Sequence, residues 1–521
     1  MRVIPRKPRG AGAEAQGRPE EHPVLEPRLK DNLERLSGLM ERNNDLISRR
    51  FLVRAAGKEA CLLHLDGLVD SLALDQDILK PLQSAPREQL PGDDEATGMS
   101  PLDGVEASLV GVTQVRRVAS LQEVVDEVFA GFTLLLMDGE REALRMDIRG
   151  GEIRSLTEPV LEQSITGPQE GMHEKLVINL ALVRRKLRDP RLVVQKSRIG
   201  RRSRNDMAVL YIDDIADPAI VEEVKARIAT IDIDGVLSVN YIAQLIDDNP
   251  WTVFPLERTT DRADVLVAEL LEGRVVVMVD ESAFAIAYPA LFVEMLQAGE
   301  DYYQKASAGA LWRAMRFLAF FLAVSLPAVY VALLGFHIEL VPYKLLNTLA
   351  QLREEVPLPV VFEAIVMELI IQLVIEAGLR LPALLAPTVG VVTGIILGQA
   401  AISAKLASPA MIVVVAMTTI VTFAIPNYNL VTSTRVLRLP MIVLAATFGL
   451  FGLALGWYVL LVHMATLQSM GQPYFAPLAP LRWRDMKDVF FRFFLFDFEY
   501  RPRSIPHQDD RRQIPPPKGG A

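Results

Sequence analysis

Residues 359–382 read PVVFEAIVMELIIQLVIEAGLRLP, a stretch that is apolar enough for a membrane and yet carries five charged or amide side chains. Side chains four positions apart share one face of a helix, so this spacing predicts a polar stripe on an otherwise apolar helix. The stripe consists of Glu368, Gln372, Glu376 and Arg380, with Glu363 outside it. A carboxylate that faces lipid costs about 3 kcal/mol, so such residues usually face a bundle interior, a partner or a water-filled path.

Two interpretations of this stripe stay open. In the first, the stripe lines or flanks an ion pathway. In the second, residues 359–377 form an amphipathic helix at the membrane interface, with its carboxylates among the headgroups and Glu376 paired with Arg380 one turn later.

The composition indicates a chain made of separate soluble and membrane parts. Hydrophobic residues make up 50% of the chain and the mean hydropathy is +0.24, yet 23% of the residues are charged. The charges lie mainly before residue 317 and after residue 481, so the membrane part is predicted between them. The lone cysteine, Cys61, excludes an intramolecular disulfide framework and favours a cytoplasmic front half, as does the lack of a signal-peptide pattern at the start.

Four apolar stretches are predicted to span the membrane, in addition to the polar stripe. They cover about 317–336, with a kink at Pro327, then 383–404, 409–426 and 440–465. Basic residues before the first stretch and after the last place both ends of the membrane part in the cytoplasm, which requires an even number of crossings. Four spans satisfy this rule, so residues 359–377 are predicted to be re-entrant or interfacial.

The second and fourth spans carry glycine patterns that predict close packing. Glycines four positions apart let helices approach, either between subunits around an axis or within one subunit. This stripe consists of Gly390, Gly394 and Gly398, followed by Gln399, which needs a polar partner, and flanked by Val391 and Ile395, which are candidates for an apolar gate. In the fourth span, GLFGLALG at 449–456 is interpreted as a packing surface rather than a dinucleotide loop.

The front half contains one structural unit twice. ACLLHLDGLVD at 60–70 resembles MAVLYIDDIAD at 207–217, and VVDEVFAGFTLLLMDGEREAL at 124–144 resembles LVAELLEGRVVVMVDESAFAI at 266–286. The longer pair predicts a helix capped by Gly131 or Gly273, a buried strand, an acidic turn and a second strand. The strand order cannot be read from this pattern.

The predicted fold class is an α+β membrane protein: two cytoplasmic α/β subdomains followed by an all-α transmembrane domain. The predicted parts are a disordered or variable tail (1–44), subdomain 1 (45–155), a helical and basic connector (156–204), subdomain 2 (205–305), the transmembrane domain (306–470) and a cytoplasmic C-terminal tail (471–521). Residues 1–26 and 504–521 are expected to be mobile.

The connector carries a basic surface, while the chain as a whole is acidic. The formal net charge is −9, so nucleic acid is not an expected partner. The basic residues Arg198, Arg201, Arg202 and Arg204 would face anionic lipid or a partner, or form an ordinary solvated surface. Motifs for phosphate loops, zinc helices and nucleophile elbows are missing, so we expect no enzyme, no cofactor and no metal site.

Several long segments resemble the A subunits of the GerA-type spore germination proteins. The most specific are SRIGRRSRNDMAVLYIDDIADPAIVEEV, VMELIIQLVIEAGLRLP, GIILGQAAI and SMGQPYFAPLAPLRWRDMKDVFFR, and the likeness covers about residues 45–503. The resemblance implies an oligomeric protein of the spore inner membrane that works with a permease-like, nutrient-sensing B subunit and a lipoprotein C subunit. It also implies a nutrient-gated cation channel.

Three alternatives to a receptor channel subunit stay open at this stage. Stage V sporulation protein AF is a paralogue with the same architecture, thought to amplify the signal. A non-conducting scaffold would assemble partners through the α/β subdomains. A secondary transporter would show two related membrane halves, and no such membrane repeat is visible in the sequence.

Overall fold

The computed structural model describes residues 24–40, 42–86, 100–150, 158–159, 161–162, 164, 166–382 and 386–513. It divides into two compact units, Met1–Arg154 with Leu180–Gln195, and Ser155–Asn179 with Lys196–Ala521. The outer parts of both predicted tails (1–23 and 514–521) and the start of the predicted span 383–404 lie outside the described residues.

The first unit is built on a five-stranded sheet with the order β1-β2-β4-β5-β3, in which all neighbouring strands are antiparallel. Apolar side chains cover both faces of this sheet in two separate cores. Its elements are α1 (Leu29–Met40), β1 (Leu46–Val53), β2 (Lys58–Leu65), α2 (Ser71–Ala73), η1 (Leu74–Leu79), α3 (Lys80–Ser84), α4 (Pro101–Ser108), β3 (Val115–Val118), α5 (Leu121–Phe129), β4 (Thr133–Met137) and β5 (Ala143–Met146).

A second five-stranded sheet repeats this design with the order β6-β7-β9-β10-β8, which is the first order shifted by five strands. The predicted duplication is therefore confirmed. The strand order, which the sequence pattern did not give, is the same in both sheets. The elements are α6 (Leu176–Lys186), β6 (Leu192–Ile199), β7 (Asn205–Ile212), α7 (Pro218–Ala229), α8 (Val239–Ile246), β8 (Arg258–Thr260), α9 (Ala263–Leu271), β9 (Val275–Val279), β10 (Ala285–Tyr288) and η3 (Phe292–Leu296).

The acidic turn of each repeat also fixes the start of a helix. Asp138 accepts a hydrogen bond from the backbone N–H of Leu29 at 3.0 Å, and Asp280 accepts one from Leu176 at 2.7 Å. A carboxylate is stabilised there because the first N–H groups of a helix lack partners within the helix. The duplication thus includes helices α1 and α6, which the sequence comparison did not reach.

Both predicted tails differ from expectation where the structure describes them. Residues in and before α1 bury an apolar face on the first sheet, because their spacing of three or four places them on one side of the helix. These residues are Leu25, Leu29, Leu33, Leu36 and Met40. At the other end, Ile505 is buried and Gln508 donates a 2.6 Å hydrogen bond to the carbonyl of Ala216 in the second α/β subdomain.

The connector 156–204 also differs from expectation. It supplies helix α6 and strand β6, and β6 is the first strand of the second sheet. The basic residues of the connector obscured this strand, because its buried apolar residues, Leu192 to Val194 and Ile199, are separated by the polar run QKSR.

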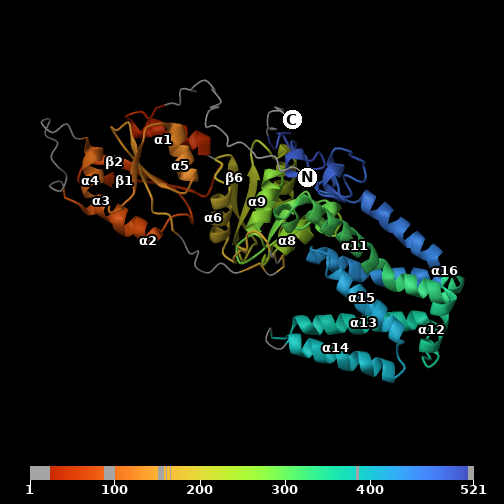
Figure 1. Cartoon of the computed structure of the whole chain (residues 1–521). Helices are drawn as coiled ribbons and strands as arrows, with labels where there is room; N and C mark the ends of the chain where they lie inside the picture. The colour runs from red at the N-terminus through yellow and green to blue at the C-terminus, as the bar shows by residue number, and fades with distance from the viewer. Residues whose placement is uncertain are drawn as a thin grey trace, which may run out of the picture. The chain divides into compact units, whose positions relative to one another are not determined.

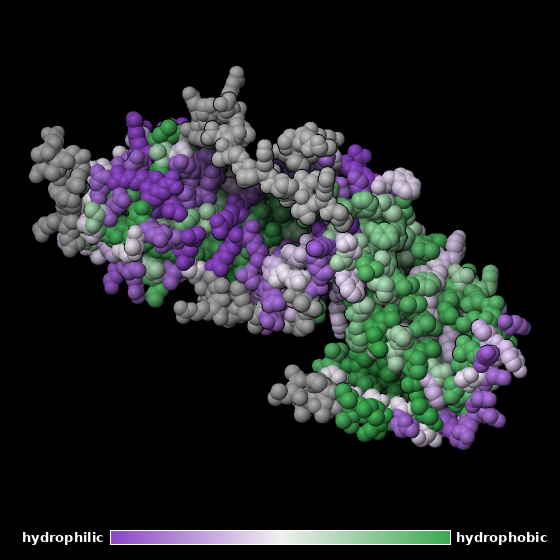
Figure 2. Space-filling view, in the orientation of Figure 1, coloured by the Kyte–Doolittle hydropathy of each residue, from purple (hydrophilic) through white to green (hydrophobic). Residues whose placement is uncertain are grey.

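A helical region follows the second α/β subdomain. Its visible face is largely hydrophobic, in contrast to the α/β part (Figure 2). The elements are α10 (Glu300–Tyr303), α11 (Ala306–Gly335), η4 (Ile338–Leu340), α12 (Tyr343–Arg353), α13 (Val360–Leu379), α14 (Ala386–Ser403), α15 (Pro409–Thr422) and α16 (Tyr428–Thr466), then β11 (Gln468–Ser469), β12 (Gln472–Pro473), η5 (Asp485–Asp488) and η6 (Leu495–Asp497). Among the described residues, α11 and α16 are the helices long and apolar enough to cross a membrane.

Helix α16 is a hairpin, which corrects the predicted single span 440–465. Gly449 has φ 63° and ψ −142°, a conformation that interrupts the helix and that essentially only glycine adopts. A Cβ on Gly456 would lie 2.5 Å from Met441 Sδ, although a straight helix would place these two residues about 22 Å apart. The chain therefore reverses at Gly449, and the predicted packing surface 449–456 packs against the preceding leg of the same helix.

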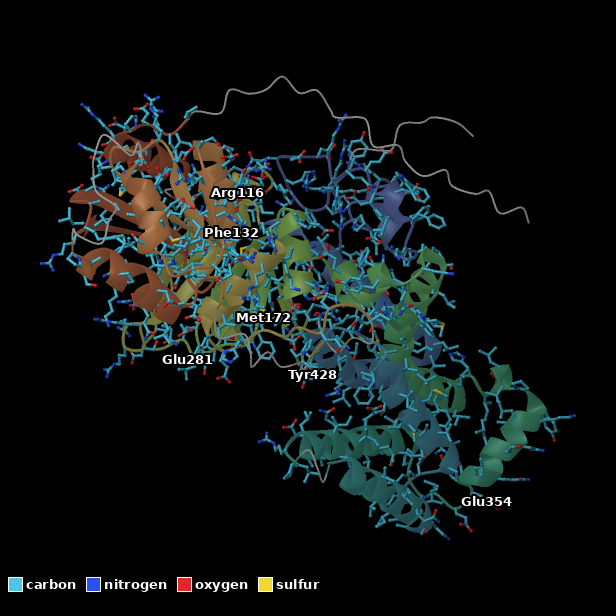
Figure 3. The ribbon with its side chains drawn as sticks, turned by 60° about the vertical axis from the view of Figure 1, so that its left-hand side comes forward. Arg116, Phe132, Met172, Glu281, Glu354 and Tyr428 are labelled. Carbon is cyan, nitrogen blue, oxygen red and sulfur yellow. The ribbon has the colours of Figure 1, made fainter. Side chains whose placement is uncertain are left out.

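The helical region has a proximal end next to the second α/β subdomain and a distal end opposite it (Figures 1 and 3). Tyr428, at the start of α16, lies at the proximal end, and Glu354, just after α12, lies at the distal end (Figure 3). In the described residues, six helical segments run between these ends: α11, α13, α14, α15 and the two legs of α16. Because the number of segments is even, the start of α11 and the end of α16 both lie at the proximal end of the helical region.

Candidate functional site

A buried arginine, Arg438 on α16, lies at the centre of the helical region. Pro327 in α11 has no N–H, so it leaves the carbonyl of Ala323, four residues earlier, without its usual helical partner. Arg438 Nε donates a 2.9 Å hydrogen bond to this carbonyl. The proline predicted to kink the first span therefore creates an acceptor that α16 satisfies.

Arg438 also bonds to two other helices. Its Nη1 donates to Glu368 Oε2 on α13 at 2.7 Å, and its Nη2 donates to the Thr422 hydroxyl at the end of α15 at 2.8 Å. The side chains of Arg438 and Glu368 are only 5% and 8% exposed. One guanidinium thus holds α11, α13, α15 and α16 together, and we call Arg438, Glu368, Thr422 and the Ala323 carbonyl the arginine hub.

The sequence predicted one half of the hub and missed the other. Glu368 was a candidate because a carboxylate in an apolar helix needs a polar surrounding. Arg438 was missed because the predicted span began at residue 440, which assigned the arginine to a loop. The useful signal is the run TSTRVLRLP at 432–440, where Arg438 directly precedes an uninterrupted apolar leg.

Glu363, which the sequence placed outside the polar stripe, is fully buried at the distal end. Its Oε1 accepts hydrogen bonds from the Ser408 backbone N–H at 2.7 Å and from the Ser408 hydroxyl at 2.6 Å. Its Oε2 lies 3.5 Å from Arg353 Nη2 at the end of α12. Since Ser408 is the N-cap of α15, Glu363 joins α12, α13 and the start of α15.

The rest of the predicted stripe lies away from the hub. Gln372 is half-buried, whereas Glu376 and Arg380 are exposed and form an ion pair of 2.8 Å at the proximal end of α13. The pairing that the interfacial interpretation expected is therefore present. The members of the stripe therefore differ in burial. Glu368 lies inside the bundle, whereas Glu376, two turns later on the same helix, lies outside it.

The glycine stripe on α14 faces away from the rest of the described chain. A Cβ added to Gly390, Gly394 or Gly398 would have no described atom within 4 Å. Val391 is 64% exposed and Ile395 is 68% exposed, and Gln399 is exposed as well. Helices α13 and α14 run side by side as a hairpin (Figure 1), so α13 is the described helix against which α14 packs.

The predicted basic surface lies on the hairpin that joins β6 to β7. Arg198 pairs with Asp206 at 3.2 Å, and Arg201 pairs with Asp232 at 3.1 Å. Arg202 lies 3.5 Å from Asp234, while Arg204 is exposed with φ 49°. Three of the four arginines therefore have a carboxylate neighbour, which reduces the positive potential of this surface.

Two of the basic residues that precede the first predicted span, the buried Arg313 and the half-buried Arg316, form ion pairs at the start of α11. Arg313 Nε lies 3.2 Å from Asp301 Oδ2, and Arg316 Nη1 lies 2.8 Å from Asp301 Oδ1. Arg313 also bonds to Asp488 in the C-terminal segment. This cluster connects the first long helix to the segment that follows the last one.

A polar cavity of about 720 Å³ lies where α8 and the loop 247–257 meet the start of α16. Glu257, 8% exposed, accepts a 3.3 Å hydrogen bond from Asn429. Burial raises the pKa of Glu257 to about 7, and burial together with the charge of Glu257 raises the pKa of Asp247 to about 8. Both carboxyls therefore favour their protonated form in the folded protein.

These raised pKa values predict that stability falls with rising pH. At these two carboxyls the folded protein binds more protons than the unfolded chain between pH 4 and 8, so their contribution to the free energy of unfolding decreases through this window. Between pH 5 and pH 8, we expect the free energy of unfolding to fall by about 2 kcal/mol less in Glu257→Gln than in wild type. Chemical denaturation at several pH values measures this, with the exposed Glu222→Gln as control. Parallel curves for wild type and Glu257→Gln would contradict it.

These features define a class of protein in which a duplicated α/β module precedes a helical region held by buried ion pairs and containing long apolar helices. The chain belongs to the Bacillus/Clostridium GerA spore germination protein family, whose model matches residues 34–504. The resemblance inferred from the sequence is therefore confirmed.

Two relatives and one solved structure illustrate the similarity. The chain is 36% identical to spore germination protein KA of Bacillus subtilis, covering 95% of this chain and 90% of that protein. It is 32% identical to stage V sporulation protein AF of the same organism, covering 88% and 91%. A crystal structure of the N-terminal domain of the A subunit of the Bacillus megaterium spore germinant receptor GerK3 is 28% identical, covers 52% of this chain and 98% of that chain, and has a TM-score of 0.41.

Proposed function

We propose that this chain is the A subunit of a spore germinant receptor and that several copies assemble in the spore inner membrane into a nutrient-gated cation channel. In this arrangement the chain works with a nutrient-sensing B subunit and a lipoprotein C subunit. The α/β subdomains and both chain termini lie in the cytoplasm, and the helical region crosses the membrane.

The observation that carries the channel proposal is the exposure of the α13–α14 hairpin. One side of it offers the uncovered glycine stripe and apolar residues such as Val391 and Ile395. Its proximal end offers Glu376 and Arg380, which are too polar to face lipid tails. A ring of identical copies would cover the glycines with a neighbouring helix and place the polar residues along a shared axis.

The six helical segments support a membrane role for α13 that differs from the sequence expectation. Helix α13 has 20 residues and is therefore about 30 Å long, which matches the hydrocarbon core of a bilayer. With α16 folded into two legs, six crossings leave both ends on the cytoplasmic side. We therefore propose that α13 spans the membrane, rather than being re-entrant or interfacial as the sequence predicted.

Neutralising Glu376 tests the proposed pathway. We expect Glu376→Gln to lower the preference for cations over anions about fivefold, because a unit charge about 4 Å from a permeating ion contributes about 1 kcal/mol in water. The measurement is ion flux and reversal potential in liposomes that contain the purified receptor subunits. The exposed Glu222→Gln in α7 removes a carboxylate outside the helical region and is the matched control.

The outcomes separate the channel from its alternatives. Unchanged selectivity in Glu376→Gln would remove this carboxylate from the path. Liposomes that stay tight with all subunits present would favour a non-conducting scaffold. Flux from this chain without a nutrient-sensing partner would favour a role like that of stage V sporulation protein AF, with which the chain shares 32% identity.

A further inference from the structure

The segment after the last long helix presents a dense row of exposed aromatic side chains. Residues 490–496 read FFRFFLF. The exposed fractions are 38% for Phe490, 60% for Phe491, 45% for Phe493, 55% for Phe494, 53% for Leu495 and 60% for Phe496. We call these six residues the aromatic ridge. Contiguous exposed apolar side chains of this kind mark a surface that another phase or molecule covers.

The ridge is held firmly on the folded protein. Arg492, in its middle, is 5% exposed and donates hydrogen bonds to the carbonyls of Asp301 at 2.6 Å and Gln304 at 2.9 Å. Just before the ridge, Asp488 accepts a hydrogen bond from the Tyr302 hydroxyl at 2.5 Å. These buried polar contacts fix the backbone, so the exposure of the aromatic rings is a property of the fold.

The ridge lies level with the start of the apolar part of α11. The rings of Phe490 and Phe317 pack with their centroids 4.7 Å apart, and Phe317 is the first residue of the predicted first span. The same turns of α11 expose Trp312 and Met315, at 53% and 50%. Tryptophan and other aromatic residues are favoured at the membrane–water interface, where a ring can lie between tails and headgroups.

We propose that the aromatic ridge inserts into the interfacial layer of the membrane on the proximal side, as a peripheral anchor beside α11. This inference rests on the proposed membrane location of the helical region. It revises the predicted cytoplasmic tail 471–521, whose first part then lies on the bilayer. The occupant is lipid because the ridge continues the apolar surface of α11, and the exposed Lys487 and Arg503 would meet anionic headgroups.

Spin labelling tests this placement. The only cysteine, Cys61, is fully buried, so a Cys61→Ala background accepts one label at a chosen position. Labels are placed at Phe494→Cys, at Phe321→Cys on α11 as a membrane reference, and at Glu222→Cys as an aqueous reference. Leu495→Cys provides a second ridge position in case the first variant does not fold. The full chain is reconstituted in vesicles of phosphatidylethanolamine and phosphatidylglycerol, and accessibility to oxygen and to a water-soluble nickel chelate is measured.

The expected result is that the labels at positions 494 and 495 are accessible to oxygen and protected from nickel, as at position 321. If the ridge labels react with nickel as at position 222 while position 321 is in lipid, the anchor is wrong and the membrane proposal stands. If the ridge labels are protected from both reagents, protein covers the ridge and the lipid assignment fails. If the label at position 321 is itself accessible to the nickel chelate, the proposed membrane location of the helical region is wrong, and the anchor proposal falls with it.

Discussion

Replacing Arg438 by methionine is expected to destabilise the helical region by about 3–5 kcal/mol. The change leaves Glu368 buried without its cation, and it removes the donors to the Ala323 carbonyl and the Thr422 hydroxyl. Removing one member of a buried pair is costly because the remaining charge keeps its desolvation penalty without compensation. Thermal or denaturant unfolding of the purified protein in detergent measures the loss.

Two further variants determine whether the loss comes from the unpaired charge. The double variant Glu368→Met with Arg438→Met should recover most of the stability, because two apolar side chains then replace the ion pair. The remaining loss of about 1–3 kcal/mol would come from the Ala323 carbonyl, which stays without a donor. Arg435→Met is the matched control one helical turn earlier, since Arg435 is half-buried and has no carboxylate within ion-pair distance in the described residues. If Arg438→Met and Arg435→Met unfold alike, the hub does not stabilise the fold.

Replacing Gly452 by alanine is expected to cost about 3 kcal/mol by forcing the two legs of α16 apart. A Cβ at Gly452 would lie 2.0 Å from the backbone carbonyl oxygen of Leu444 on the opposite leg. Backbone atoms cannot move aside as a flexible side chain can, so the strain spreads along the hairpin. The midpoint of unfolding in detergent measures the effect, and proteolysis near the turn at Gly449 shows whether the legs separate.

A graded series of glycine variants provides the controls. At Gly456 the nearest atom is Met441 Sδ, which can rotate away, so Gly456→Ala should cost less than Gly452→Ala. At Gly378 on α13 an added Cβ would have no described atom within 4 Å, and Gly378→Ala should be neutral or stabilising by about 0.5–1 kcal/mol. Equal effects at all three positions would contradict a close-packed hairpin.

The parts of the fold that depend on local pattern were predictable. Each acidic turn follows a run of five buried strand residues, and Gly131 and Gly273 have φ values of 94° and 97° where a helix ends. These features were readable because strand alternation, helix capping and turn chemistry involve residues close together in the chain. Helix α1 was not predicted, although its buried leucines follow the helical period, because its polar surroundings favoured a tail.

The candidate site was predictable only one residue at a time. The sequence selected Glu363 and Glu368 because carboxylates are unusual in an apolar helix. It could not distinguish them from Glu376, whose side chain is exposed, because helical spacing shows which residues share a face and not what that face contacts. The partners Ser408 and Arg438 lie 45 and 70 residues away along the chain, and no local pattern connects them to the carboxylates.

The sequence by itself determined the duplicated α/β module, the presence of an apolar helical region after it and the family, because these follow from short-range periodicity and from long matching segments. Only the tertiary structure decided the strand order, the reversal of α16 at Gly449 and the pairing of Glu368 with Arg438. The physical reason is that helical periodicity shows which residues share one face of a helix. Which distant segment packs against that face depends on the tertiary structure.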